Sequence, residues 1–241
     1  MMKKRSIVII FGSSGSIGSE IVYGFQKKGF EVWAAVRDQK KIKNNHKNLN
    51  FFYYDSDLND SNKSFEIFKK NSIDAIVWAQ GKNLSDNIYD LDIEEHLDVY
   101  KANVTFILKS LQSVLQLKLL KNKSRICIIS SVWQNLAKNN KLSYCVSKSA
   151  LQGLVNSLSI DLGREGVLVN AILPGAIDNQ MTRDNLNKKQ IDSIKKQSPL
   201  NSLAIYSDLV ELAYFLCSAE NSGITGQFIA ADRGFSNARI F

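Results

Sequence analysis

Residues 6–18 read Ser-Ile-Val-Ile-Ile-Phe-Gly-Ser-Ser-Gly-Ser-Ile-Gly, an apolar run that leads directly into three glycines. A continuous run rich in β-branched side chains is typical of a strand buried in a parallel sheet. A helical pattern follows, with apolar residues at Ile21, Val22 and Phe25, and we expect Gly29 to end this helix. Because glycines admit close approach of the backbone and a helix N-terminus offers free N–H groups, the stretch predicts a cradle for phosphate groups.

The spacing of the three glycines is by itself also compatible with a tight turn that binds nothing. The strand before it and the helix after it favour the phosphate-binding interpretation. The same alternation continues along the chain, with helical patterns between short apolar runs. These runs predict strands at residues 31–36, 51–54, 75–78, 125–129, 168–173 and 227–230. We therefore predict the α/β class, as a single-domain, doubly wound parallel sheet (Rossmann-like) with helices on both faces.

No composition break, internal repeat or low-complexity tract divides the 241 residues, so we expect one domain over 1–241. Residues 1–100 would form mainly the cofactor half, and residues 101–241 mainly the catalytic and substrate half. The segment at about 176–200 is polar, basic and helix-prone, which predicts a mobile lid.

The formal net charge is +8, but the basic residues lie in small scattered groups. This favours a solvated surface over a nucleic-acid site, and an anionic substrate or cofactor fits the excess equally well. The 3 cysteines have no metal or redox spacing, and 2 histidines cannot build a His-rich metal site, so we expect no metal. The first apolar run is too short for a signal sequence or a membrane span. We therefore expect a cytoplasmic protein that binds neither nucleic acid nor membrane.

Tyr144 and Lys148 are four residues apart in a helical pattern, which would stack their side chains on one face. A tyrosine with the reference pKa of about 10 exchanges protons poorly at neutral pH. A neighbouring ammonium favours the phenolate, and we expect Lys148 to lower the pKa of Tyr144 by roughly 2 to 3 pH units. The pair is a candidate proton donor and acceptor for carbonyl and alcohol chemistry.

A second pair with the same spacing, Tyr23 and Lys27, lies in the helix after the glycine loop. Chance explains such a pair easily in a lysine-rich chain, and either pair alone is more often a surface coincidence. Context separates the two pairs. Ser131 follows a predicted strand, and doubly wound sheets place their chemistry at the carboxyl ends of strands. Asn103 lies at the predicted start of a long helix, where its simplest role is that of a cap.

The chain resembles the short-chain dehydrogenase/reductase family over nearly its whole length. The resemblance rests on the glycine loop, Asp57 with Asp60, Asn103, Ser131, Tyr144-x-x-x-Lys148, Pro174-Gly175, and Ile224-Thr225-Gly226-Gln227 before Asp232. Each motif is common by itself, but all of them in this order are highly specific. The resemblance implies a nicotinamide cofactor, a sheet flanked by helices and frequently a homotetramer.

The resemblance also implies individual roles. Tyr144 would exchange a proton with the substrate oxygen, which Ser131 would orient. Lys148 would hold the nicotinamide ribose, and Asn103 would hold a water that links Lys148 to solvent. The catalytic tetrad would thus be Asn103, Ser131, Tyr144 and Lys148. The residues expected to bind the cofactor are Gly12, Ser14, Gly15, Ile17, Gly18, Arg37, Asp57, Leu58, Ala79, Gly81, Tyr144, Lys148, Pro174, Gly175, Ile177 and Asn179.

Residues after the second predicted strand bear on the choice of cofactor. Arg37 could pair with the 2′-phosphate of NADP, whereas Asp38 could bond the free 2′-hydroxyl of NAD. In the family, NAD-specific members usually carry a carboxylate at the last residue of that strand, which is Val36 here. We therefore expect NADP(H) rather than NAD(H).

Several positions depart from the family pattern. Phe11 stands where threonine is usual, and Asn179 stands where a threonine commonly meets the nicotinamide amide. Trp78-Ala79-Gln80-Gly81 replaces Asn-Asn-Ala-Gly, so a sheet-bracing asparagine is missing, and Arg233 replaces a glycine in Asp-Gly-Gly. None of these changes removes the expected chemistry.

We predict an NAD(P)(H)-dependent oxidoreductase that transfers hydride reversibly between the nicotinamide and a ketone or secondary alcohol. NADPH-driven reduction of a 3-oxoacyl thioester, a sugar or a small ketone is favoured, with Trp133, Gln134 and the lid lining the pocket. The expected partners are this small-molecule carbonyl or alcohol substrate and further copies of the chain, as a tetramer or dimer. The alternative is a non-catalytic dinucleotide-binding regulatory protein on the same fold, for which the altered residues 78–81 are the best support.

Overall fold

The computed structural model describes residues 5–37, 49–54, 61–70 and 72–237. Within them, seven parallel strands form one sheet in the order β3-β2-β1-β4-β5-β6-β7. The strands are β1 (Ile7–Phe11), β2 (Glu31–Val36), β3 (Asn50–Tyr53), β4 (Ile73–Trp78), β5 (Leu120–Ile129), β6 (Leu168–Pro174) and β7 (Phe228–Ala231). The predicted doubly wound α/β sheet is thus confirmed.

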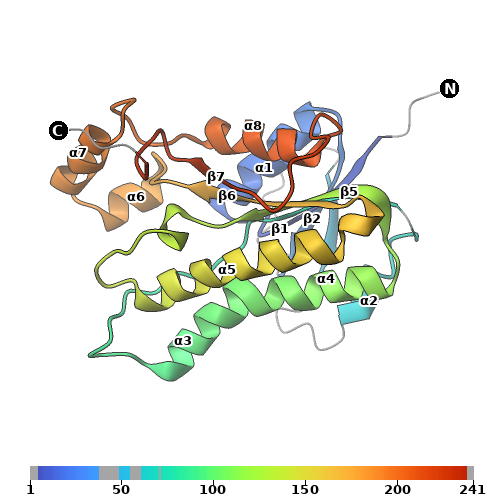
Figure 1. Ribbon diagram of the computed structural model, residues 1–241, viewed down its shortest axis with the longest axis horizontal. Helices are drawn as coiled ribbons and strands as arrows, with labels where there is room; N and C mark the ends of the chain where they lie inside the picture. Colours follow the sequence, from blue (N-terminus) through green and yellow to red (C-terminus); the bar gives the residue numbers. More distant parts are fainter. Residues whose placement is uncertain (1–4, 38–48, 55–60, 71, 238–241) are drawn as a thin grey trace.

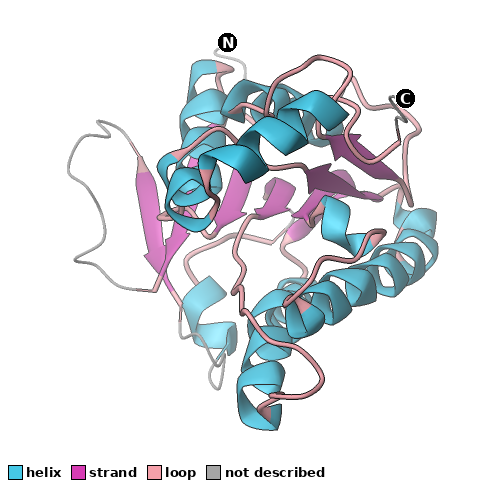
Figure 2. Ribbon diagram, turned by 90° about the vertical axis from the view of Figure 1, so that its left-hand side faces the viewer, coloured by secondary structure: helices cyan, strands magenta, loops and turns pink. Residues whose placement is uncertain are grey.

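Helices cover both faces of this sheet, as Figure 1 shows from the side and Figure 2 after a quarter turn. The helices are α1 (Ser16–Lys27), α2 (Ser61–Phe65), α3 (Ile93–Tyr100), α4 (Phe106–Gln116), α5 (Leu142–Asp161), α6 (Gln180–Asn185), α7 (Lys188–Gln197) and α8 (Tyr206–Cys217). One buried apolar cluster lies between the sheet and α1 and α8, and a second lies between the sheet and α4 and α5. Gly24 lets α1 and α8 approach closely, because a Cβ there would lie 2.2 Å from Val210 Cγ1.

Two departures from the family pattern, Phe11 and Trp78, are neighbours in the register of β1 and β4. Their rings stack with centroids 5.6 Å apart and planes 7° apart, and both side chains are fully buried. Trp78 Nε1 donates to Ser110 Oγ at 3.0 Å, so the indole N–H is satisfied. The two side chains therefore form one buried aromatic unit. Gln80 does not replace the missing bracing asparagine, because both polar atoms of its carboxamide are buried without a hydrogen-bond partner.

The prediction that Asn103 opens a helix is wrong. α3 and α4 form one continuous helix, joined by a π-helical segment over Lys101–Thr105 that contains Asn103. The helix begins ten residues earlier, where Asp92 accepts hydrogen bonds from the amides of Glu94 and Glu95. An aspartate followed within three residues by two glutamates is typical of a helix N-terminus, and it marks the start of this helix in the sequence. Single π-helical turns inside α-helices occur frequently at functional sites.

The largest shift of a predicted strand boundary is in β5, which begins at Leu120 rather than Arg125. A register shift opposite Asp74 accommodates the polar residues of this longer strand. α2 ends at Phe65, and Ile67, two residues beyond this end, is 53% exposed.

The strand order places two loops side by side. From β1 the chain winds outward to β2 and β3, and then returns to β4 on the other side of β1. The loops that follow β1 and β4 therefore meet at the carboxyl edge, where the winding reverses. In open parallel sheets this crevice is the usual ligand site.

Candidate active site

The glycine loop after β1 packs directly on the loop after β4. Gly12 has φ +72°, and a Cβ there would lie 2.4 Å from the backbone nitrogen of Gln80. A Cβ on Gly18 would lie 2.1 Å from the carbonyl oxygen of Gly12. Ser13 is buried and donates to the carbonyl oxygen of Ala35 at 2.7 Å, which fastens the loop to β2. Side chains at these two glycines would thus fill the cradle predicted from the sequence.

The start of α1 is open toward this crevice. Gly15 is the N-cap in an extended conformation, and as a glycine it has no side chain to cap the helix. The first amides of a helix, here from Ser16, Ile17 and Gly18, have no partner within the helix. Together with the helix dipole they suit an anionic group. The residues present therefore fit the pyrophosphate of a dinucleotide, and Ser14 lies exposed in the same loop.

Arg37 lies exposed directly after β2, near the end of β3. Burial raises the pKa of Tyr54 to about 12, and the nearby positive charge of Arg37 acts in the opposite direction. The guanidinium of Arg37 therefore lies near the carboxyl ends of β2 and β3. The rival residue Asp38 and the predicted cofactor residues Asp57 and Leu58 lie outside the described residues.

Ser131 and Tyr144 come together from two different elements. Ser131 follows β5, is buried, and caps a short 3₁₀ turn by accepting from the amide of Trp133 at 3.3 Å. Tyr144 lies in the first turn of α5. Burial raises the pKa of Tyr144, and the nearby Ser131 hydroxyl acts in the opposite direction. The two hydroxyls are thus close enough to influence one another.

Lys148 lies one turn further along α5 and is buried. Its Nζ donates to the carbonyl oxygen of Ile129 at 3.1 Å and lies 5.7 Å from the centroid of the Tyr144 ring. Burial lowers the pKa of Lys148 to about 8. The expectation that Lys148 lowers the pKa of Tyr144 is wrong for this structure, because burial raises that pKa and the ammonium of Lys148 donates to the Ile129 carbonyl instead.

Asn103 reaches the same place from the π-helical segment and is 1% exposed. Its Oδ1 accepts from the amide of Lys82 at 2.7 Å, and its Nδ2 donates to Ser147 Oγ at 2.8 Å. Ser147 in turn donates to the carbonyl oxygen of Tyr144 at 2.8 Å. A Cβ on Gly81 would lie 3.2 Å from Asn103 Oδ1 and 3.7 Å from Lys148 Nζ. Asn103 and Lys148 are therefore brought together beside Gly81, and Tyr144 lies one turn before Lys148 on α5.

Two residues of this arrangement were missed from the sequence. Ser147 is buried and links Asn103 to the backbone of α5, and Lys82 holds the Asn103 side chain through its backbone. Their positions carried a usable signal: Ser147 is three residues after Tyr144 on the same helix face, and Lys82 directly follows Gly81.

The remaining predicted cofactor residues lie around the end of β6. Pro174 ends this strand, and Gly175 lies so close to Asp232 that a Cβ would be 2.7 Å from Asp232 Cβ. Ile177 is buried and pairs with Ala204. Asn179 caps α6: its Oδ1 accepts from the amide of Thr182 at 2.8 Å, and its Nδ2 donates to the hydroxyl of Tyr206 at 3.1 Å. Ala79 continues the pairing of β4 by donating to the carbonyl oxygen of Phe11 at 3.0 Å.

The predicted pocket residues behave differently from one another. Trp133 is half-buried and contacts Phe235, with ring centroids 6.3 Å apart. Gln134 is buried, and its Oε1 accepts from Ser130 Oγ at 2.8 Å, so it braces the end of β5 instead of presenting a free amide.

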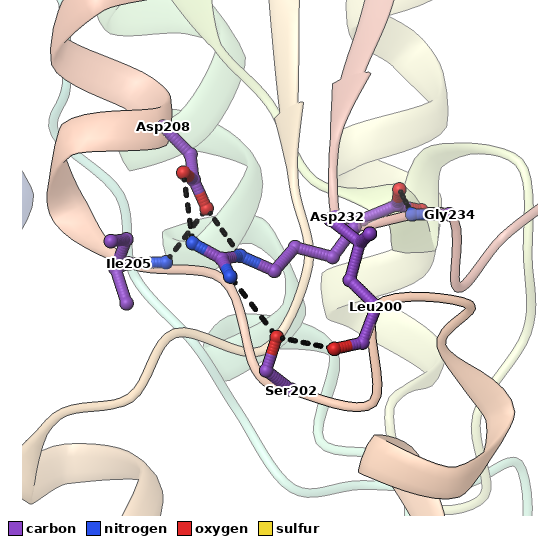
Figure 3. A network of polar contacts seen from close by, with 7 residues as sticks. Leu200, Ser202, Ile205, Asp208, Asp232 and Gly234 are labelled. Atoms are coloured by element: carbon purple, nitrogen blue, oxygen red, sulfur yellow. Dashed lines mark hydrogen bonds and ion pairs between the residues drawn. The ribbon is translucent and has the colours of Figure 1, made fainter.

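Arg233, which stands where the family has glycine, closes a separate polar network (Figure 3). Its φ of +58° is unfavourable for a side-chain-bearing residue. Its guanidinium binds both carboxylate oxygens of Asp208, at 2.8 and 3.1 Å, and Ser202 Oγ at 3.0 Å. Burial would raise the pKa of Asp208, but the bonds from Arg233 and from the Ile205 amide hold it below its usual value. These bonds offset the backbone strain.

A surface hollow of about 600 Å³ adjoins this network, lined by Leu200, Asp208, Leu212 and residues 230–234. It contains none of the four predicted catalytic residues. In the described part of the chain, no helix is long and apolar enough to span a membrane, and no group of three His, Cys, Asp or Glu could hold a metal ion.

Comparison with known proteins agrees with this geometry. A sequence model of a family described as enoyl-(acyl carrier protein) reductase matches residues 12–236. The chain is 32% identical over 233 residues to a 3-oxoacyl-[acyl-carrier-protein] reductase of Rickettsia typhi, covering 94% of this chain and 95% of the relative. It is 26% identical over 232 residues to an L-rhamnose 1-dehydrogenase (NADP(+)) of Thermoplasma acidophilum, covering 95% and 85%. A short-chain dehydrogenase family protein of Francisella tularensis superposes with a TM-score of 0.86 at 26% identity, covering 98% and 100%.

Proposed function

The chain belongs to the short-chain dehydrogenase/reductase family, and we propose that it is an NADPH-dependent ketone reductase whose preferred substrate is a 3-oxoacyl thioester. The observation that carries the proposal is the convergence of Ser131, Tyr144, Lys148 and Asn103 beside the glycine loop. The name of the Rickettsia relative favours the 3-oxoacyl thioester among ketones. The intact tetrad speaks against a non-catalytic dinucleotide-binding protein.

The cofactor, when bound, supplies hydride from the nicotinamide C4. Its pyrophosphate would rest on the backbone at Gly12, Ser14, Gly15, Ile17 and Gly18. Arg37 would pair with the 2′-phosphate, and the backbone at Ala79 and Gly81 would line the ribose side. Pro174, Gly175, Ile177 and Asn179 would border the nicotinamide. Asp57 and Leu58 complete the proposed set.

The side chains of the chain itself would manage the proton. Tyr144 would give its hydroxyl proton to the carbonyl oxygen of the substrate, while Ser131 would donate a hydrogen bond that orients the same oxygen. A pKa of about 8 keeps Lys148 mostly cationic at pH 7, so it can donate hydrogen bonds to the nicotinamide ribose. Asn103 fixes the loop at Lys82 that borders this site, and we propose that it also retains the water linking Lys148 to solvent.

A substrate panel tests the proposed function. NADPH oxidation would be followed with acetoacetyl thioester, crotonyl thioester and small diketones, and NADP⁺ reduction with L-rhamnose. We expect the highest kcat/KM with the acetoacetyl thioester and no reduction of the crotonyl thioester, which has no ketone for Tyr144 and Ser131 to polarise. Faster reduction of the crotonyl thioester would refute ketone reduction, and a preference for L-rhamnose would point to a sugar dehydrogenase.

The exposed Arg37 predicts the choice of nicotinamide cofactor. A hydrogen bond to a charged group contributes roughly 1.5 to 3 kcal/mol, which corresponds to about a ten- to hundredfold preference for NADPH. We expect Arg37→Ala to raise the KM for NADPH at least about tenfold while changing that for NADH less than about threefold. Steady-state kinetics with both cofactors would measure this. A wild-type enzyme with the higher kcat/KM for NADH would instead point to Asp38.

We propose that the protein is a homo-oligomer, most simply a tetramer, built through the outer faces of α4 and α5. Leu108 on α4 is 46% exposed, and Val146 and Ile160 on α5 are 43% and 77% exposed, so both helices carry apolar surface beyond what the sheet buries. We expect light scattering at micromolar concentration to give about two or four times the 27.1 kDa of one chain. A mass of 27.1 kDa would contradict the proposal.

Two further assignments complete the proposal. The segment at 176–200, which contains α6 and α7, would act as the lid over the substrate, and the whole chain would form one domain. The enzyme would work in the cytoplasm, which is consistent with its three free cysteines.

A further inference from the structure

The helix that carries Tyr144 and Lys148 has no cap of its own. Lys141 is the N-cap of α5, and its side chain makes no capping hydrogen bond. The cap comes instead from Asp86, which lies 57 residues earlier in the chain. The amide of Ser143 donates to Asp86 Oδ1 at 3.1 Å and to Oδ2 at 3.3 Å, and the Ser143 hydroxyl also donates to Oδ2. Asp86 is 5% exposed and Ser143 is 1% exposed.

The whole segment Lys82–Asp86, which we call the strap, is fastened to the same helix end. Lys141 Nζ donates to Asn83 Oδ1 at 3.0 Å, to the carbonyl oxygen of Leu84 at 3.0 Å and to Ser85 Oγ at 2.9 Å. The other end of the strap is held by Asn103, which bonds both backbone groups of Lys82. One short segment therefore connects the proposed catalytic asparagine to the first turn of the proposed catalytic helix.

The hydrogen bonds run in one direction through this cap. A serine hydroxyl has a single hydrogen, and that of Ser143 goes to Asp86. Ser143 Oγ must therefore accept from His96 Nδ1, which lies 2.8 Å away on α3. The order of donation is His96 to Ser143 to Asp86. α3, the strap and α5 are thus joined at the residue that directly precedes Tyr144.

We propose that Asp86 is a positioning residue that sets the place of the Tyr144 hydroxyl relative to Ser131. The proposal rests on the proposed function, because it assigns no chemistry to Asp86 itself. Later turns of α5 are anchored independently by Leu151 and Val155, which are fully buried. Loss of the cap should therefore displace the first turn and leave the fold intact. A misplacement of about 1 Å in an active site can lower the rate about a hundredfold.

The test compares Asp86→Ala, Asp86→Asn and Asp90→Ala. Asp90 is the matched control, because its carboxylate lies in the next part of the same loop and accepts from the amide of Asn87 instead of from α5. We expect Asp86→Ala to lower kcat per NADPH-binding site by about 10- to 100-fold, with the KM for NADPH changed less than about threefold. Asp86→Asn keeps an acceptor for the Ser143 amide and should restore kcat to within about fivefold of wild type.

Hydrogen exchange of the cofactor-free protein gives a readout that needs no activity. In Asp86→Ala the amides of the first turn of α5 should exchange at least about tenfold faster, while those around Leu151 and Val155 stay protected. Unchanged kcat per site, or faster exchange along the whole of α5, would overturn the positioning role. A wild-type protein that reduces no carbonyl, or a fully active Tyr144→Phe, would refute the proposed function and the positioning role with it. If Tyr144→Phe loses activity while Asp86→Ala stays fully active, only the positioning role of Asp86 is refuted.

Discussion

Tyr144→Phe is expected to lower kcat by about 10²- to 10⁴-fold or more, because general acid–base catalysis typically contributes a factor in this range. The substitution removes the proton donor and keeps the ring, so the packing of the half-buried side chain persists. Burial raises the pKa of Tyr144, so the hydroxyl carries little charge in the folded state at neutral pH. We therefore expect NADPH affinity and Tm to stay near wild type, as measured by cofactor fluorescence titration and thermal melting.

The chain provides its own control in Tyr23→Phe. Lys27 Nζ lies 4.3 Å from the centroid of the Tyr23 ring, closer than Lys148 is to Tyr144. Tyr23 lies on α1 and is 48% exposed. If closeness of a lysine to a tyrosine were sufficient for catalysis, Tyr23→Phe would be the more damaging change. We expect it to be nearly neutral, and equal losses in the two variants would contradict the assignment.

The fold could be predicted because the sequence patterns that indicate it are local and recur along the chain. Short apolar runs alternate with helical patterns, and the loop after β1 needs glycine at Gly12 and Gly18 because neighbouring backbone atoms lie within 2.4 Å of where a Cβ would be. Such patterns survive in a single sequence. The π-helical segment could not be predicted, because Lys101–Thr105 carries ordinary helix-compatible residues. Its contact with α5, from Asn103 to Ser147, joins residues far apart in the sequence.

The sequence offered candidates for the site but not their electrostatics. The ordered set of motifs along the chain selects Ser131, Tyr144 and Lys148 as candidates, and these stay a prediction that the variants above would test. The influence of Lys148 on Tyr144 depends on burial and on the Ile129 carbonyl, and neither can be read from a spacing of four residues. Asp86 was missed for the same reason, because a cap supplied from 57 residues away has no local signature.

Lys148→Met is expected to lower kcat at least about a hundredfold and, at the same time, to stabilise the protein at neutral pH. Burial lowers the pKa of Lys148 from 10.5 to about 8, which means that the folded state disfavours the charged form. One pH unit of difference corresponds to about 1.4 kcal/mol, so the charge destabilises the fold by roughly 3 kcal/mol. The hydrogen bond from Lys148 Nζ to the Ile129 carbonyl offsets about 1 kcal/mol of this destabilisation. We therefore expect Lys148→Met to raise the free energy of unfolding by about 1 to 3 kcal/mol.

The pH dependence of this gain gives the decisive measurement. Below pH 8 both the folded and the unfolded chain carry the proton on Lys148, so the destabilisation is fully present. Between pH 8 and 10.5 the folded chain loses the proton first, and wild-type stability recovers as pH rises. Denaturant unfolding should therefore show Lys148→Met more stable than wild type at pH 7 and nearly equal to it above pH 10.5. Lys27→Met, which removes an exposed lysine, should show no such trend. A Lys148→Met protein that is less stable than wild type by the same margin at both pH values would mean that the buried ammonium stabilises the fold.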